Sequence, residues 1–176
     1  MRVGFIKQLL WERYGQCWRS LVQGVEADVL EAEPTRMIRH YETHSPTEVS
    51  GVQFRLAMAE ALALNDVDVL IVPDLNPNKT ASRGGGQDPW IASFPETLQR
   101  FAGLPPILKV PATLDTRLEP LVLETLLSIK RDPATVRRVW ERNLPNLKPK
   151  RYPEPRWTRL SGQKETAGLI GQPWLL

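Results

Sequence analysis

The chain has 176 residues and a mass of 20.0 kDa, the usual size of one globular domain. Hydrophobic residues make up 41% of it, enough for a core, and no apolar run approaches the roughly 18 residues that cross a bilayer. A single Cys excludes an internal disulfide and a set of thiolates for an iron–sulfur cluster within one chain. The first residues carry no apolar core long enough for a secretory signal, so we expect a cytoplasmic protein without membrane partners.

The net charge of +3 is unevenly distributed along the chain. The segment from Lys130 to Lys164 holds eleven Lys and Arg against three acids, a local charge of +8, and the rest holds 12 against 17, or −5. Prolines recur through the same basic segment, and because proline has no N–H, no continuous helix or central strand is expected beyond Leu144. We therefore predict an α/β domain over residues 1–144 and an extended basic arm over residues 145–176.

The first half of the body alternates between strand and helix patterns. Val3 to Ile6 is a short apolar run, and Trp11 to Val25 repeats apolar residues every three or four positions, as an amphipathic helix does. Ala27 to Ala32 predicts a second strand, so the beginning of the chain is typical of a βαβ unit with a right-handed crossover. A short helix is predicted over Thr35 to Tyr41, and an Ala- and Leu-rich helix over Ser50 to Leu64.

The second half continues the alternation. Asp68 to Pro73 is a continuous β-branched run, typical of a strand buried on both faces of a parallel sheet. A helix is predicted over Pro89 to Phe101, a strand over Ile107 to Val110, and a long helix, or two helices broken near Asp132, over Leu118 to Leu144. The fold class is therefore α/β: a Rossmann-like parallel sheet of about four strands flanked by helices, with a C-terminal helical segment and the Pro-rich arm.

Parallel sheets bind ligands beyond the carboxyl ends of their strands, where backbone amides and helix N-termini converge. The predicted strand ends, together with the loop from Asn76 to Asp88, place basic, amide, acidic and glycine residues at this edge. A triple glycine beside basic side chains lets backbone amides approach an anion. The candidate ligand-binding residues are Lys7, Gln8, Asp74, Asn76, Arg83, Gly84, Gly85 and Gly86.

Each of these candidates has an alternative structural interpretation. The glycines lack the G-x-G-x-x-G and GK[ST] patterns of known phosphate loops, so the stretch also fits an ordinary flexible surface loop. Asp74 is the best candidate for an active carboxylate, and the alternative is a side chain that caps the following turn. No catalytic motif is found, and the turn from Lys7 to Trp11 has no glycine for a nicotinamide dinucleotide, so we predict no cofactor.

Metal binding is not expected either. Glu42 lies between His40 and His44, one residue later than the Glu of the H-E-x-x-H motif, and Pro46 ends any helix soon afterwards. Cys17, the single cysteine, falls within a predicted helix and is expected to be a buried or half-buried packing residue.

Several segments occur in an order that resembles a known family. They are Arg2 to Leu10, a Trp-containing helix, Glu26 to Val29, Val67 to Asp74, Phe94 to Leu98 and Gly103 to Leu108. Over roughly residues 2–115 this order is similar to the domain of unknown function associated with 2-hydroxyacyl-CoA dehydratases and their ATP-dependent activases. The resemblance implies a Rossmann-type scaffold.

Members of that family typically carry two cysteine motifs, which are taken to bind an iron–sulfur cluster. The Cys-Leu-Pro motif would fall near Ser50 to Phe54, and the Cys-Pro motif near Asp88 to Trp90, where only the proline is retained. The resemblance therefore implies a shortened relative that keeps the scaffold without the cluster. Such a relative would bind a small anionic ligand, or a protein partner, at the strand ends.

The basic C-terminal region supports a different function, nucleic-acid binding. Arg side chains would contact phosphates and Trp side chains, Trp140 among them, would stack on bases. The proposed residues are Arg137, Arg138, Arg142, Lys150, Arg151, Arg156 and Trp157. The arm also carries large apolar residues, so it equally suits an arm that docks on the acidic body or on a second copy in a homodimer.

Overall fold

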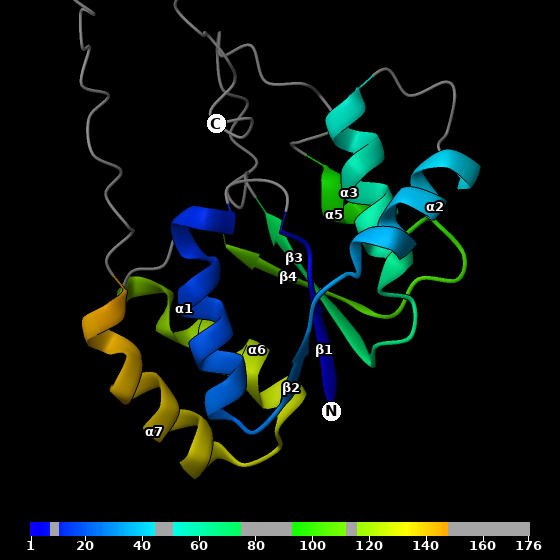
Figure 1. Ribbon diagram of the computed structural model, residues 1–176. Coiled ribbons are helices and arrows are strands. Elements are labelled where there is room, and N and C mark those ends of the chain that lie inside the picture. Colours follow the sequence, from blue (N-terminus) through cyan, green and yellow to red (C-terminus); the bar gives the residue numbers. More distant parts are fainter. Residues whose placement is uncertain (8–10, 45–50, 75–92, 112–115, 148–176) are drawn as a thin grey trace, which may run out of the picture.

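The computed structural model describes residues 1–7, 11–44, 51–74, 93–111 and 116–147, so the predicted arm beyond Leu147 lies outside the described residues. Four strands form one parallel sheet in the order β2-β1-β3-β4 (Figure 1). They are β1 (Arg2–Phe5), β2 (Asp28–Leu30), β3 (Val69–Asp74) and β4 (Ile107–Pro111). The predicted α/β, Rossmann-like fold is confirmed.

Strand β3 lies inside the sheet and is buried on both of its faces. Val69 and Ile71 pack into one apolar cluster, whereas Leu70 and Val72 pack into another on the opposite face. This two-sided burial explains why the strand has an unbroken apolar sequence, because side chains alternate between the two faces and each face is covered by helices.

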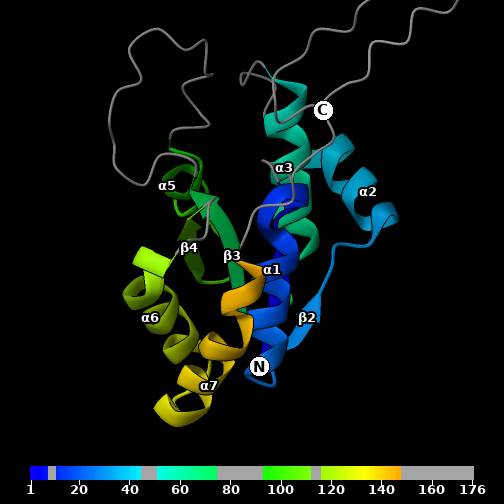
Figure 2. The ribbon, with the colours of Figure 1, turned by 90° about the vertical axis from the view of Figure 1, so that its left-hand side faces the viewer.

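Helices α1 (Trp11–Gly24), α6 (Glu119–Ile129) and α7 (Pro133–Asn143) cover the first face (Figures 1 and 2). Trp18 and Trp140 are fully buried among them. The predicted break in the long C-terminal helical segment is present, because the Asp132 carboxylate accepts hydrogen bonds from the amides of Ala134 and Thr135 and begins a new helix.

Helices α3 (Val52–Ala63) and α5 (Phe94–Leu98) cover the second face, and α2 (Pro34–His44) packs on the outside of α3 (Figure 2). Phe54 meets Phe94 edge to face, with 6.0 Å between the ring centroids. In both views the first turns of α3 extend beyond the ends of the strands. This helix therefore has side chains available at the carboxyl edge of the sheet.

Helices α2 and α5 end at other residues than predicted, and the predicted start of α5 at Pro89 lies outside the described residues. Helix α2 continues to His44 rather than ending at Tyr41, because no helix-breaking residue occurs before Pro46. Helix α5 ends at Leu98, before the predicted end at Phe101, and the chain then turns through Gly103, whose φ of 85° suits glycine. Short 3-10 turns, Thr116–Leu118 and Leu144–Asn146, flank the C-terminal helices.

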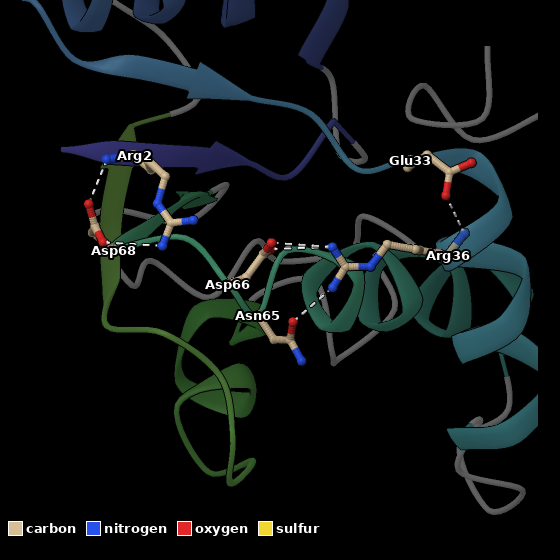
Figure 3. A network of polar contacts seen from close by, with 6 residues as sticks. All are labelled: Arg2, Glu33, Arg36, Asn65, Asp66 and Asp68. Atoms are coloured by element: carbon tan, nitrogen blue, oxygen red, sulfur yellow. Dashed lines mark hydrogen bonds and ion pairs between the residues drawn. The ribbon is translucent and has the colours of Figure 1, made fainter.

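Polar contacts fix the opposite, amino edge of the sheet and the start of α2 (Figure 3). The Arg2 amide donates to Asp68 at 2.6 Å, which joins the beginnings of β1 and β3. Arg36, in the first turn of α2, contacts Asp66 at 3.4 Å and Asn65 at 3.0 Å. The Glu33 carboxylate accepts from the amides of Thr35 and Arg36, so this residue caps α2.

Candidate site at the carboxyl edge

Strands β1 and β3 are neighbours, and both end at the carboxyl edge. The ladder between them finishes where Ile6 donates to the Ile71 carbonyl. The next residue of β3 that faces β1 is Pro73, which has no N–H to donate to that strand. The chain runs from β1 to β2 on one side of β1, and from β3 to β4 on the other side. Open parallel sheets bind ligands at such a switch point, where the direction of the connections reverses.

Lys7 follows β1 and lies in a charged cluster at this edge. Its Nζ contacts Oε2 of Glu31, and Nη2 of Arg19 contacts Oε1 of the same carboxylate. Glu31 follows β2, and Arg19 comes from α1, so three elements meet here. The hydrogen bond from Lys7 is the main cause that lowers the pKa of Glu31 below its ordinary value. We call Lys7, Arg19 and Glu31 the carboxyl-edge cluster, and its formal charge is +1.

Glu60 joins the main chain of Lys7 to α3. Its carboxylate accepts a hydrogen bond of 2.9 Å from the Lys7 amide, and the residue is only 2% exposed. Its helix is buried on nearly every side, since Ala57 to Ala61 are all buried in succession. A carboxylate in such surroundings is costly unless hydrogen bonds compensate for lost water, so Glu60 has a specific structural role in holding the end of β1.

Of the ligand-binding residues predicted from the sequence, the structure describes two. Lys7 and the half-buried Asp74 lie at the same edge, on the ends of neighbouring strands. The remaining candidates lie outside the described residues: Gln8, Asn76, Arg83, Gly84, Gly85 and Gly86.

Three residues of this edge were not predicted from the sequence: Arg19, Glu31 and Glu60. The sequence does contain a signal for two of these residues, Glu31 and Glu60. Glu31 directly follows β2, which ends at Leu30 and therefore earlier than predicted. Glu60 is a lone acid within the apolar stretch from Ala57 to Ala63. Nothing in the sequence around Arg19 distinguishes it from other charged residues on an amphipathic helix.

Cys17 packs against the first core cluster and is half-buried, as expected. Burial raises the pKa of its thiol to about 11, so the reactive thiolate is scarce at neutral pH. Within the part of the chain that the structure describes, no three His, Cys, Asp or Glu side chains are grouped as metal ligands, and no helix is long and apolar enough to cross a membrane.

The residues of α7 proposed for nucleic-acid binding comprise exposed arginines and a buried tryptophan. Arg137, Arg138 and Arg142 are exposed, and Arg137 lies 3.4 Å from Glu141 and 3.7 Å from Glu119. Trp140 is 1% exposed and part of the core, so the expectation that it stacks on bases is wrong. Trp140 follows the buried Val136 by four residues, so both lie on the buried face of an amphipathic helix. Lys150, Arg151, Arg156 and Trp157 lie outside the described residues.

No family model, curated protein or solved structure matches the chain.

Proposed function

We propose that the protein binds a small anionic ligand at the carboxyl edge of its sheet, beyond β1 and β3. The observation that carries this proposal is the position of Lys7, a cation directly after β1 at the switch point of a parallel sheet. The carboxyl-edge cluster supports it, because its two cations share a single carboxylate, that of Glu31. Glu60 supports it further by holding the Lys7 main chain in place.

A panel of small anions tests this function through thermal stability, because a ligand that binds only the folded state raises the melting temperature. We expect at least one anion to raise the melting temperature of the full chain, and Lys7→Gln to remove the effect. The matched control is Lys130→Gln, because Lys130 also pairs with one glutamate, Glu26, but does so at the amino edge. The proposal fails if no anion stabilises the protein, or if Lys7→Gln and Lys130→Gln respond alike.

We also propose to assign this protein to the 2-hydroxyacyl-CoA dehydratase and activase-associated proteins, as a cytoplasmic relative without the cluster. The resembling segments coincide with structural elements, since Val67 to Asp74 contains β3, Phe94 to Leu98 is α5, and Gly103 to Leu108 leads into β4. Elemental analysis of the purified full chain should find no stoichiometric iron or zinc. About one metal or cluster per chain would overturn the assignment.

Nucleic-acid binding is the second candidate function, and the exposure of Arg138 and Arg142 on α7 favours it. These side chains are four residues apart, so they lie on the same side of the helix and are available for phosphate contacts. If this function holds, Arg138→Gln with Arg142→Gln weakens binding to RNA or DNA and makes it less sensitive to salt. Lys7→Gln should then have no such effect, which separates the two functions.

We also propose that the C-terminal arm, predicted over residues 145–176, joins two copies in a homodimer through its part beyond Leu147. The described chain ends at Leu147, whose side chain packs into the first core cluster, while Leu144 beside it is 38% exposed. The exposed apolar surface where the arm begins favours docking over a free tail. Light scattering should give a dimer for the full chain and a monomer after truncation at Leu147. Equal masses for both would contradict the dimer.

A further inference from the structure

Arg19 has an unused hydrogen-bond donor beside the carboxyl-edge cluster. Its Nη2 contacts Glu31, but its Nε is buried and has no hydrogen-bond partner among the residues that the structure describes. Nε and Nη2 form one side of the planar guanidinium, the side that usually holds two oxygens of one anion at once. Only half of this side is therefore used, and a buried donor without an acceptor destabilises the folded state.

Glu31 does not supply the missing acceptor in this arrangement, because neither of its oxygens accepts from Nε. One carboxylate oxygen is at Arg19 and the other is at Lys7. The cluster thus offers three donors, Nε and Nη2 of Arg19 and Nζ of Lys7, to a group that has two oxygens. An anion with three free oxygens can give one to each donor.

Charge leads to the same class of anion. Lys7 and Arg19 together carry +2 against the −1 of Glu31, and Glu60, the other acid on Lys7, is held by the main-chain amide of that residue. A phosphate group carries about −1.5 to −2 at neutral pH and has three oxygens that accept strong hydrogen bonds. The cluster is also open to water, because the side chains of Lys7, Arg19 and Glu31 are 39%, 33% and 35% exposed. A small anion can therefore approach the cluster, and it reaches the donors of Arg19 and Lys7 by displacing the partly exposed Glu31.

We propose, on the basis of the function proposed above, that the ligand is a phosphate group, free or as a monoester, which displaces Glu31 from Lys7 and Arg19. Glu31 then acts as an internal competitor that occupies the anion site when no ligand is bound. Its charge weakens phosphate binding both by holding the two cations and by repelling the incoming anion.

Calorimetric titration of the full chain with inorganic phosphate, glycerol phosphate and acetate tests this competition. Glu31→Gln should bind phosphate roughly tenfold or more tightly than the natural chain, because a nearby like charge is removed. Adding Arg19→Lys to that variant should abolish the gain, since lysine keeps the charge but cannot offer the paired Nε and Nη2 donors. The affinity for acetate, which has two oxygens, should rise much less than the affinity for phosphate or its ester.

Glu26→Gln is the matched control, because it removes a glutamate from a simple pair with Lys130 at the amino edge and should leave phosphate affinity unchanged. Melting curves of all variants, with Glu31→Ser as a second replacement, identify any variant that fails to fold. The inference is wrong if both Glu31 variants bind phosphate no more tightly than the natural chain. It is also wrong if their affinity for acetate rises as much as their affinity for phosphate. If the natural chain still binds an anion through Lys7 in that case, the proposed function stands; no binding by any variant overturns both.

Discussion

At the scale of single residues, Glu60 is the most unusual side chain of the described structure. It places a carboxylate within a helix that is buried between the sheet and α2, and the Lys7 amide is one of its partners. The amide of Lys7 is the first beyond the β1–β3 ladder. Glu60 therefore gives this amide an acceptor where β1 ends, and it fixes where the chain leaves β1.

Substitutions of Glu60 measure how much this hydrogen bond contributes to the free energy of unfolding. Glu60→Met removes the acceptor and nearly keeps the volume, so we expect the free energy of unfolding in urea to fall by about 1–3 kcal/mol. Glu60→Gln retains a carbonyl acceptor and should lose less. Glu42→Met, at an exposed position of α2, should change stability by no more than about 0.5 kcal/mol. Equal stability of the two Glu60 variants would show that the hydrogen bond is unimportant.

Asp68 links the stability of the sheet to pH. The hydrogen bond from the Arg2 amide is the main cause that lowers the pKa of this carboxyl below its ordinary value of 3.8. A carboxyl with a lowered pKa in the folded state stabilises the fold at pH values above its ordinary pKa. That contribution is lost as the pH falls through the lowered value.

Two measurements check this effect at Asp68. A carboxyl NMR titration of the folded protein should give Asp68 a midpoint below 3.8. Between about pH 6 and about pH 2, Asp68→Asn should lose less stability than the natural chain, because it has no proton to take up. A midpoint at or above 3.8, or an identical loss of stability in both proteins, would be inconsistent with the Arg2 contact.

At the scale of elements, the sequence predicted all four strands and their order along the chain, because strands buried on both faces leave long apolar runs such as that of β3. It also predicted the division between α6 and α7, since Asp132 followed by Pro133 is a strong local signal for the start of a helix. The predicted ends of α2 and α5 were less accurate. Where a helix stops depends partly on its packing, and residues before and after the end leave only weak local signals.

The candidate site was less predictable than the elements. Lys7 and Asp74 could be placed because the end of a parallel strand is a local property of the sequence. Arg19 and Glu31 are 12 residues apart, and the pairing of Lys7 with Glu60 spans 53 residues. Such contacts arise only once α1 and α3 pack on their two faces of the sheet, so no local pattern contains them.

Helices α1 and α7 approach each other closely at Gly24. A Cβ atom added at this position would lie 2.6 Å from Cγ1 of the buried Val139. We therefore expect Gly24→Ala to lower the free energy of unfolding by about 1–2 kcal/mol, although alanine is the better helix former. In a Val139→Ala background, which removes the contacted methyl groups, the same change should cost much less. Equal costs in both backgrounds would contradict the close packing.

At the scale of the whole molecule, the sheet separates structural and binding regions. Both faces are occupied by helices that bury the two apolar clusters. The amino edge is fixed by the contacts of Arg2 and Arg36, whereas the carboxyl edge collects Lys7, Arg19 and Glu31 from three different elements. Positive charge in a position supported by rigid elements is suited to holding an anion in a defined orientation.

The central claim, that an anion binds at the carboxyl edge, is tested most directly by following the backbone amide NMR signals of the full chain during a phosphate titration. We predict saturable shifts at Ile6, Lys7, Glu31 and Ala32, which follow β1 and β2, with little change at Arg2 and Asp68 at the amino edge. Shifts confined to the amino edge or to Arg138 and Arg142 of α7, or no saturable shift at all, would contradict the claim.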